Sequence, residues 1–255
     1  MAAAFCCVPV SPMRSEPSHK SEMVSQMVFG ESCEIMDLDR IPWIKIRCQY
    51  DGYEGWCQDS HISYLHPGQG NAGKYLTADW VTNLEFNGSR MMVPLGSSIP
   101  GRKDNGAGWG ENKIYCDGEG WDPDKAIKDA GSISHLARKF LNTAYLWGGK
   151  SIFGIDCSGY TQTVCKLFGI YLLRDAHQQA LQGATVGFLE ESVCGDLAFF
   201  DNSEGFIVHV GILLNNHEII HASGKVRIDK IDNLGIIHSE NLQRTHHLTA
   251  LKRFF

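Results

Sequence analysis

The stretch "GIDCSGYTQTVCKLFG", residues 154–169, decides how the second half of this chain folds. Asp156 is a preferred N-cap residue, and Gly169 stands where a helix commonly ends. Between them, apolar residues recur at helical spacing on one stripe. The residues of this stripe are Tyr160, Val164, Leu167 and Phe168. The pattern predicts a helix that begins near Cys157 and carries these apolar residues on one stripe.

The position of Cys157 in the first turn of this helix suggests a nucleophile. Unpaired backbone N–H groups and the positive end of the helix dipole stabilise a thiolate there, and the same donors can hold an oxyanion. The alternative is a buried, inert thiol, which is the role we expect for Cys165 in the middle of the helix. For Asp156, the alternative to a functional role is a helix cap alone.

Helices come first and strands later in this half of the chain. "SISHLARKFLN" (132–142) has helical periodicity with Ser132 as its expected cap, and a third helix is expected from Asp175 to Gly183. Beyond them the chain returns to β-type runs separated by polar turns. These runs are "DLAFF" (196–200), "IVHVGILL" (207–214), "EIIHASG" (218–224) and "KVRIDKI" (225–231). The order predicts an α+β domain.

Two histidines lie in adjacent predicted strands, His209 and His221. If residues 215–217 form a three-residue connection, Leu214 faces Glu218 and both histidines project from the same face of the sheet. The asparagines of that connection suit a left-handed position. A two-residue loop would put the histidines on opposite faces.

Each histidine alone is best interpreted as a core residue. Combined with a cysteine at a helix start, they match the nucleophile, base and orienting residue of cysteine hydrolases. We therefore treat Cys157, His209 and His221 as the candidate catalytic set.

The N-terminal half consists of short β-type runs. Residues 1–65 are interpreted as a small β-barrel, with the Asp51-Gly52 pair as a hairpin turn. "HPGQGNAGK" (66–74) has the composition of a linker, and a second small β unit is expected at 75–120. The third predicted domain spans residues 122–255.

Composition excludes several classes of function. The chain has 255 residues, and its net charge of −6 comes from interspersed acids and bases, so neither nucleic acid nor membrane insertion is expected. The nine cysteines include no C-x-x-C pair and no clustered ligands, so we expect reduced thiols, no metal and no organic cofactor. The oligomeric state is left open, with a monomer as the expectation.

The first residues, "MAAAFCCVPV", lack the basic and long apolar regions of a signal peptide. We therefore expect a cytoplasmic protein. A chain from which a signal peptide had been removed would look the same, so a periplasmic protein or a lipoprotein is the alternative.

The motifs around Cys157 resemble the signatures of the NlpC/P60 cysteine peptidases. The matching stretches are "YLWGGKSIFGIDCSGYTQTV" (145–164), "GDLAFFD" (195–201), "HVGILL" (209–214) and "IIHASG" (219–224). The resemblance covers about residues 122–255 and implies a papain-like α+β fold. It also implies Cys157 as nucleophile, His209 as base and His221 as the third polar residue.

The preceding residues resemble bacterial SH3-type modules, through "MRSEPSHKSEMVSQMVFGE" (13–31) and "DGYEGW" (51–56). Such modules precede the peptidase domain in a subgroup that cleaves cell-wall peptides with a free N-terminal L-Ala, between γ-D-Glu and the following diamino acid. The resemblance implies that Tyr145 lies near the oxyanion. It assigns substrate contacts to Asp156, Ser158, Trp147, Tyr53 and Glu22, with Glu16 as an alternative to Glu22.

These residues also have ordinary alternatives: a core position for Trp147 and surface strand positions for Tyr53 and Glu22. The resemblance implies a cysteine dipeptidyl-peptidase of murein-peptide recycling, with a small murein peptide as its partner. Whether L-Lys or meso-diaminopimelate follows γ-D-Glu is left open. Two rival functions are a non-catalytic binder of wall fragments and a thioester acyltransferase on the same fold.

Overall fold

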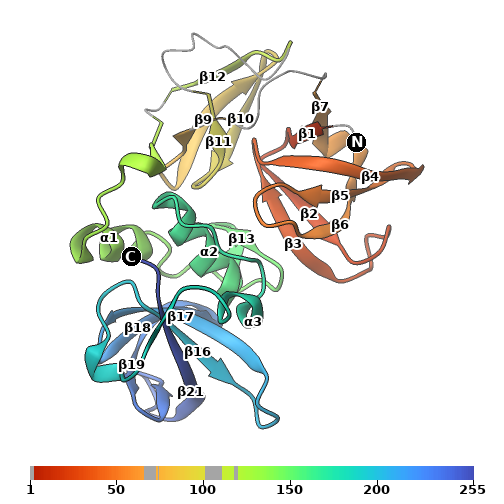
Figure 1. Ribbon diagram of the computed structural model, residues 1–255. Helices are drawn as coiled ribbons and strands as arrows, with labels where there is room; N and C mark the ends of the chain where they lie inside the picture. Colours follow the sequence, from red (N-terminus) through yellow and green to blue (C-terminus); the bar gives the residue numbers. More distant parts are fainter. Residues whose placement is uncertain (1–2, 66–72, 74, 101–110, 118–119) are drawn as a thin grey trace. The chain divides into compact units, whose positions relative to one another are not determined.

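The computed structural model describes residues 3–65, 73, 75–100, 111–117 and 120–255. The chain divides into two compact units, shown in Figure 1. Unit 1 comprises Met1–Lys125 and Trp147–Ile152, and unit 2 comprises Ala126–Leu146 and Phe153–Phe255. The predicted domain boundaries 1–65, 75–120 and 122–255 stay predictions.

Unit 1 begins with a seven-stranded antiparallel sheet in the order β3-β2-β6-β5-β4-β1-β7. Its strands are β1 (Ala3–Cys6), β2 (Val10–Arg14), β3 (Met23–Val28), β4 (Ser32–Arg40), β5 (Trp43–Cys48), β6 (Glu54–Gln58) and β7 (Ile62–Tyr64). Gly52 has φ +72° between β5 and β6, so the predicted Asp51-Gly52 turn is present. The sheet encloses an apolar core that includes Met13, Ile44 and Ile46.

Smaller sheets follow in unit 1. The strands are β8 (Tyr75–Leu76), β9 (Val81–Phe86), β10 (Ser89–Pro94), β11 (Ser98–Ile99) and β12 (Ile114–Cys116), and β9 pairs with both β10 and β12. Phe5 of β1 and Phe29, directly after β3, share one buried cluster with Leu84 of β9 and Val93 of β10. Because the two sheets share this core, they form one compact unit.

A short segment from later in the chain completes unit 1. Residues Trp147–Ile152, with strand β13 (Lys150–Ser151), belong to it. The Lys150 ammonium lies 3.5 Å from the Glu31 carboxylate, and both side chains are buried. The Lys150 N–H also donates to Gln26 Oε1 at 2.8 Å. A buried ion pair and a buried hydrogen bond thus hold this segment.

Unit 2 contains three α-helices and a seven-stranded sheet in the order β15-β21-β16-β17-β18-β19-β20. The helices are α1 (Ala130–Arg138), α2 (Cys157–Leu167) and α3 (Ala176–Gln179). The strands are β14 (Gly154–Ile155), β15 (Ala184–Val186), β16 (Leu197–Asp201), β17 (Ile207–Asn215), β18 (Glu218–Ser223), β19 (Lys225–Asp232), β20 (Gly235–Ile237) and β21 (Arg244–Arg253). Helices α1 and α2 pack on β17, from outside the sheet (Figure 1).

The sheet of unit 2 closes on itself, because β20 also pairs with β21. The resulting barrel holds a core that includes Phe200, Ile219 and Ile236. In the strand register these three residues stand opposite His209, Asp229 and His246. Directly paired residues project from the same face of a sheet. The two histidines and the aspartate therefore point into the barrel.

The hairpin between β17 and β18 differs from its prediction. Its turn holds only two residues, 216–217, and Asn215 rather than Leu214 pairs with Glu218. A register irregularity between Leu213 and Asn215 restores the parity that a two-residue loop would have inverted, and Gly211 faces His221. The predicted left-handed asparagine was wrong, because neither Asn215 nor Asn216 has a positive φ.

The helices differ from their predictions in two details. Asp129, not Ser132, caps α1, because its carboxylate accepts the Ser132 N–H at 2.7 Å. The third helix is shorter than predicted and covers only Ala176–Gln179. The end of α2 is as predicted, since Gly169 has φ +68°.

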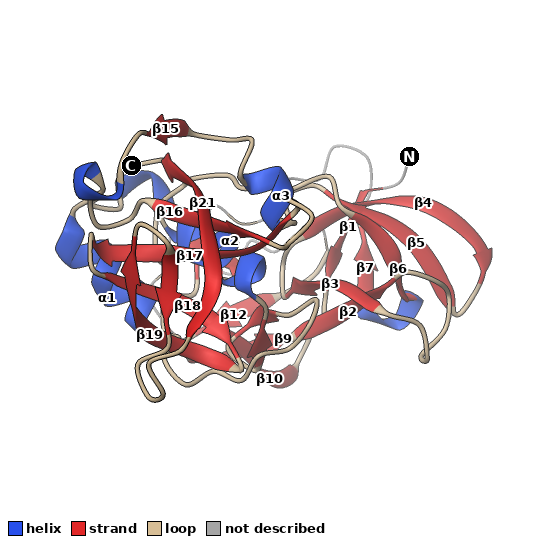
Figure 2. Ribbon diagram, turned by 90° about the horizontal axis from the view of Figure 1, so that it is seen from below, coloured by secondary structure: helices blue, strands red, loops and turns tan. Residues whose placement is uncertain are grey.

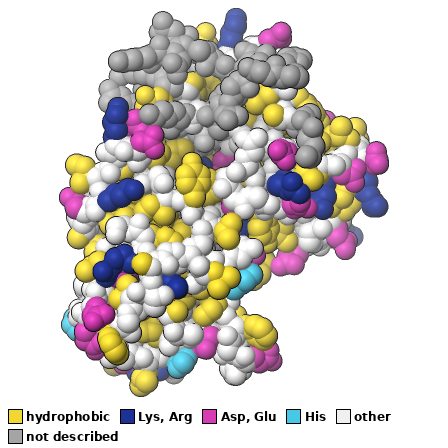
Figure 3. Space-filling model, viewed as in Figure 1, with side chains coloured by type: hydrophobic (Ala, Val, Ile, Leu, Met, Phe, Trp, Pro, Cys, Tyr) yellow, Lys and Arg dark blue, Asp and Glu magenta, His cyan; other side chains and the backbone are white. Residues whose placement is uncertain are grey.

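Strands make up most of the regular secondary structure that is described, as Figure 2 shows, so the α+β class stays a prediction. Acidic and basic side chains are interspersed on the face seen in Figure 3. None of the described helices is long and apolar enough to span a membrane.

Candidate active site

Cys157 is the first residue of α2 and is only 6% exposed. As predicted, Asp156 caps this helix, and its Oδ1 accepts the Gly159 N–H at 2.7 Å. The backbone N–H groups of Val210 and Ser158 lie close enough to the Cys157 sulfur to lower its pKa. Because Val210 follows His209 directly, the thiol lies beside the strand that carries the candidate base.

The protonation of the thiol differs from the sequence prediction. Burial, with the Asp156 carboxylate as the next cause, raises the pKa of Cys157 to about 12. The Val210 N–H, the Arg174 guanidinium and the Ser158 N–H oppose this shift without cancelling it. The helix start alone thus does not produce a thiolate, and the resting form is a neutral thiol.

The two histidines form a hydrogen-bonded pair inside the barrel. His209 Nε2 lies 2.8 Å from His221 Nδ1, and both residues are buried. Burial, followed by charge repulsion from His221 and His246, lowers the pKa of His209 well below its ordinary value. The base is therefore neutral at rest, and its Nδ1 is the ring nitrogen that His221 does not engage.

The pair extends to a third buried group, Asp229, which the sequence reasoning missed. His221 Nε2 lies 3.1 Å from Asp229 Oδ2, and Asp229 is 2% exposed. Burial opposes ionisation, but the hydrogen bonds from His221, the Ser239 N–H and Arg227 together lower the pKa of Asp229 below its ordinary value. One signal for Asp229 was present in the sequence. Asp229 lies two residues before Ile231, so both share one strand face, and Ile231 is buried in the core.

His246 was also missed. Its ring stacks on the His209 ring, with 4.2 Å between centroids and 25° between planes. Burial and repulsion from His221 lower the pKa of His246 to about 4. His246 therefore covers one face of the base as a neutral ring. No local pattern indicates this contact, because His246 lies 37 residues beyond His209 and its register depends on barrel closure.

Asp156 is already engaged by a buried cation, Arg174, which the sequence reasoning did not identify. Arg174 is 1% exposed, and its two terminal nitrogens contact Asp156 Oδ1 at 3.1 Å and Oδ2 at 2.5 Å. The same guanidinium donates to Ser158 Oγ at 2.9 Å. Asp156 and Ser158 thus form one buried network directly beside the nucleophile.

Tyr145 lies in the same unit, near the thiol. Burial raises the pKa of its phenol, and the charges of Cys157 and Asp156 add to the effect. Its backbone N–H donates to Gly224 O at 3.0 Å, and it pairs with Ile155. The structure thus brings together six of the predicted site residues in unit 2. These are Cys157, His209, His221, Tyr145, Asp156 and Ser158.

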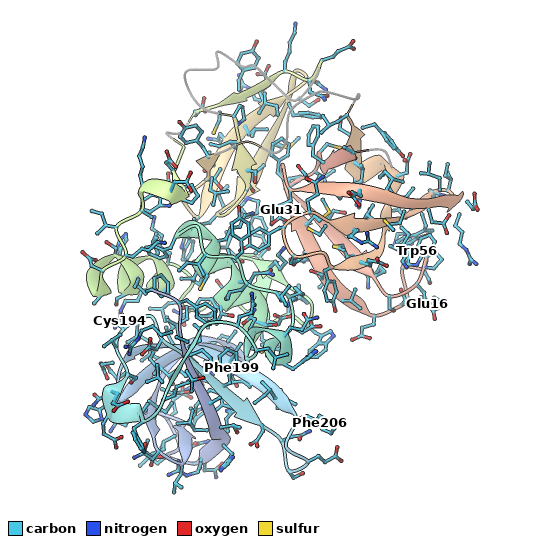
Figure 4. All side chains as sticks on the ribbon, in the orientation of Figure 1. Glu16, Glu31, Trp56, Cys194, Phe199 and Phe206 are labelled. Carbon is cyan, nitrogen blue, oxygen red and sulfur yellow. The ribbon has the colours of Figure 1, made fainter. Side chains whose placement is uncertain are left out.

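The other predicted contacts, Trp147, Glu22 and Tyr53, belong to unit 1. The Trp147 indole N–H donates to Glu22 Oε1 at 2.6 Å, and Trp147 is 60% exposed. Tyr53 packs, half-buried, against the core of the first sheet. Glu16, labelled in Figure 4, lies on the loop between β2 and β3, where its carbonyl accepts the Ser21 hydroxyl. Within unit 1 the structure thus pairs Trp147 with Glu22 rather than with Glu16.

Among the residues that the structure describes, no group of three or more His, Cys, Asp or Glu side chains is arranged to hold a metal ion.

Comparison with known proteins gives two domain matches. The profile of the NlpC/P60 family matches residues 142–242, and that of the bacterial dipeptidyl-peptidase SH3 domain matches residues 13–62. The first match contains Cys157, His209 and His221.

Individual relatives match most of the chain. A gamma-D-glutamyl-L-lysine dipeptidyl-peptidase of Bacillus cereus is 25% identical over 80% of this chain and 68% of its own length. Dipeptidyl-peptidase 6 of Lysinibacillus sphaericus is 23% identical over 99% of both chains. The crystal structure of an NlpC/P60 family protein from Bacillus cereus superposes with a TM-score of 0.77, over 98% of this chain and 99% of that one, at 18% identity. This last likeness is one of fold.

Proposed function

Since this chain carries an NlpC/P60 domain behind a bacterial dipeptidyl-peptidase SH3 domain and is therefore a peptidase, we propose that it hydrolyses the γ-D-Glu to diamino acid bond of murein peptides with a free N-terminal L-Ala. The observation that carries the catalytic part is the buried His209–His221 pair, with the N–H of Val210, the residue after His209, close to the Cys157 sulfur. The substrate class is supported by the names of the relatives, which are gamma-D-glutamyl-L-lysine dipeptidyl-peptidase and dipeptidyl-peptidase 6.

The mechanism starts from a neutral thiol and a neutral imidazole. His209 Nδ1 takes the thiol proton as the Cys157 sulfur attacks the γ-D-glutamyl carbonyl carbon. The protonated His209 then gives this proton to the leaving amine, the carbon–nitrogen bond breaks, and a thioester remains. Water, deprotonated by His209, attacks the thioester and releases L-Ala-γ-D-Glu with the thiol restored.

The backbone N–H groups in the first turn of α2 suit the developing oxyanion, and we assign Tyr145 to its support. Hydrogen-bond donors that are fixed before the reaction stabilise charge that appears only in the transition state. Burial, which disfavours the resting thiolate, strengthens these interactions once the charge forms.

The dipeptidyl register requires recognition of the substrate ammonium. We assign this to Glu22 and Tyr53, with Trp147 holding the Glu22 carboxylate through its indole N–H. A longer peptide would leave this carboxylate without its cationic partner, which disfavours internal cleavage. Asp156 contributes through its network with Arg174 and Ser158 rather than as a free carboxylate.

The test is mass spectrometry of L-Ala-γ-D-Glu-L-Lys, its meso-diaminopimelate counterpart and their N-acetylated forms after incubation with the protein. We expect L-Ala-γ-D-Glu from the free peptides, little from the acetylated ones, and none with Cys157→Ala. Intact free peptides after long incubation would contradict the proposal and favour the wall-fragment binder. An aminolysis product formed with an added amine would favour the acyltransferase.

The ammonium assignment has its own matched pair of variants. Glu22→Gln should reduce the preference for free over acetylated peptide, whereas Glu16→Gln should leave that preference unchanged. An unchanged preference in Glu22→Gln would remove this residue from the site.

We further propose that the protein acts as a monomer in the cytoplasm, on peptides released during murein recycling. A periplasmic or lipid-anchored location is the alternative. Cell fractionation with an antibody against the chain distinguishes these locations.

A further inference from the structure

Beyond the nucleophile and its two histidines, the barrel of unit 2 contains a buried carboxylate that is in contact with none of the reacting atoms. We propose that Asp229 is a positioning residue that fixes the tautomers of His221 and His209, so that Nδ1 of His209 is free to accept the thiol proton. This inference rests on the cysteine peptidase chemistry of the proposed function and does not depend on which peptide is cleaved.

The hydrogen-bond partners of Asp229 show that its carboxylate is ionised. Its Oδ1 accepts the Ser239 N–H at 2.8 Å and an Arg227 N–H at 3.1 Å. Arg227 Nε also lies 2.9 Å from its Oδ2. A carboxylate with these partners stays ionised and can only accept hydrogen bonds. His221 Nε2, at 3.1 Å from Asp229 Oδ2, must therefore carry a proton.

The proton on His221 Nε2 then determines the tautomer of both imidazole rings. A neutral imidazole has one N–H and one lone pair, so His221 Nδ1 is an acceptor. It lies 2.8 Å from His209 Nε2, which must then be the donor. His209 in turn has its lone pair at Nδ1. The orientation of both hydrogen bonds thus follows from one acceptor-only group at the end of the chain.

The proton balance of the reaction agrees with this arrangement. When Nδ1 of His209 takes the thiol proton, its Nε2–H continues to donate to His221, and no proton needs to reach Asp229. The negative charge of Asp229 stabilises the imidazolium through the intervening ring. When Nδ1 gives the proton to the leaving amine, the original tautomers are restored.

The remaining charged and titratable neighbours do not replace Asp229. His246 of β21 contacts the face of the His209 ring, not its nitrogens. Glu240 lies 3.5 Å from Arg227 and is largely exposed. His238 acts on His221 only through charge. The ring of His221 is thus hydrogen bonded to His209 and Asp229, and to none of these three neighbours.

The substitution Asp229→Asn separates this role from packing. An amide has nearly the shape of the carboxylate, but its NH₂ can donate to His221 Nε2. His221 would then carry its proton at Nδ1 and donate to His209 Nε2, which leaves the His209 proton at Nδ1. That tautomer cannot accept the thiol proton. Asp232→Asn is the matched control, because Asp232 lies on the same strand in an exposed pair with Arg244.

The experiment measures the rate of Cys157 alkylation by iodoacetamide against pH, together with ¹⁵N resonances of the histidine rings assigned with a His209→Gln variant. We expect the wild-type spectrum to show Nε2–H on both His209 and His221. Asp229→Asn should slow alkylation at neutral pH by about 10²-fold or more, within the range of general-base contributions, and Asp232→Asn should not. Neither readout uses a peptide, so failure of the substrate assignment is seen separately.

A wild-type spectrum with the proton on Nδ1 of His209 would overturn the inference, even if Asp229→Asn failed to fold. Alkylation by a folded Asp229→Asn variant within about threefold of wild type would overturn it as well.

Discussion

The buried contact between Arg174 and Asp156 gives the most direct test of how the nucleophile is held. We consider Arg174→Met, which keeps an unbranched side chain of similar length and removes the charge. Arg174 is 1% exposed and contacts both oxygens of Asp156, as well as Ser158 Oγ. The substitution therefore leaves a buried carboxylate next to Cys157 without its cation.

The expected magnitude follows from this burial. Removal of one partner of a buried ion pair costs about 3–5 kcal/mol, because the other charge stays in a poorly solvated position. Asp156 keeps the Gly159 N–H at 2.7 Å and the Ser158 hydroxyl at 3.3 Å, which offset part of the loss. We therefore expect about 3 kcal/mol, the low end of this range, which raises the equilibrium constant for opening of α2 by roughly 150-fold.

The assay must report on unit 2. Residues 126–146 and 153–255 contain no tryptophan, so tryptophan fluorescence follows only unit 1. Native-state hydrogen exchange with mass spectrometry gives the opening free energy of peptides that cover α2. The same peptides can be compared in wild type, Arg174→Met, Asp156→Asn and the double variant.

The double variant decides between charge and packing. Asp156→Asn/Arg174→Met has no buried charge and keeps an oxygen for the helix cap, so it should be more stable than Arg174→Met by about 1–2 kcal/mol. A loss below about 1 kcal/mol in Arg174→Met would refute the reasoning. So would a double variant that is less stable than both single variants.

Three further predictions concern other parts of the chain. Unit 2 should lose stability as the pH falls from about 6.5 to 4. Burial lowers the folded-state pKa of His209 and His246, so the unfolded state binds more protons than the folded state in this pH range. Hydrogen exchange of α2 measures the loss, and an opening free energy that does not change with pH would contradict the prediction. Lys150→Met should destabilise unit 1 by about 3 kcal/mol, because it removes the cation paired with the buried Glu31. The control Lys45→Met, at the more exposed pair with Glu54, should cost less than about 1 kcal/mol. Urea unfolding followed by tryptophan fluorescence measures both losses, and equal losses would contradict the prediction. His246→Phe should keep the rate of Cys157 alkylation within about threefold of wild type, because any aromatic ring can cover the face of His209. His246→Ala should give a lower rate than His246→Phe. Equal rates in the two variants would exclude a stacking role.

Local patterns predicted α2 well. Asp156 caps the helix and Gly169 ends it with φ +68°, because both features depend on backbone groups within a few residues. The cap of α1 failed for a similar local reason. Asp129 accepts the N–H of Ser132, the residue that was predicted to be the cap. Aspartate and serine are both preferred N-cap residues, so the choice between Asp129 and Ser132 depends on where the first turn begins.

The face shared by the two histidines could be predicted only in part. His209 and His221 do share a face, but the predicted pairing of Leu214 with Glu218 was wrong. The correct face results from a two-residue turn combined with a bulge, and each of these two changes alone would have inverted it. Sequence alone does not reveal such compensation, because a bulge is set by packing on both sides of the strand.

Residues whose roles depend on tertiary contacts were not found from local patterns. Asp229 reaches His221 from a neighbouring strand, and His246 reaches His209 from a strand that pairs with both ends of the sheet. Arg174 reaches Asp156 from 18 residues away, on the loop that follows α2. For His246 and Arg174 spacing along the chain carries no information about the contact, whereas Asp229 contacts His221 across the β18–β19 hairpin, whose register could have indicated it.

The protonation of Cys157 shows why a correct motif led to a wrong pKa direction. A helix N-terminus stabilises a nearby anion by at most about 2 kcal/mol. Burial raises the pKa of this thiol from 9.0 to about 12, which disfavours the thiolate by about 4 kcal/mol. The larger effect wins, and the same burial keeps His209 neutral. Charge separation is therefore left to the moment of attack, when the sulfur passes its proton to Nδ1 and its developing negative charge moves to the substrate oxygen. In a site of low polarity, the fixed N–H groups of α2 and the buried Asp229 then act on charges that did not exist before the substrate arrived.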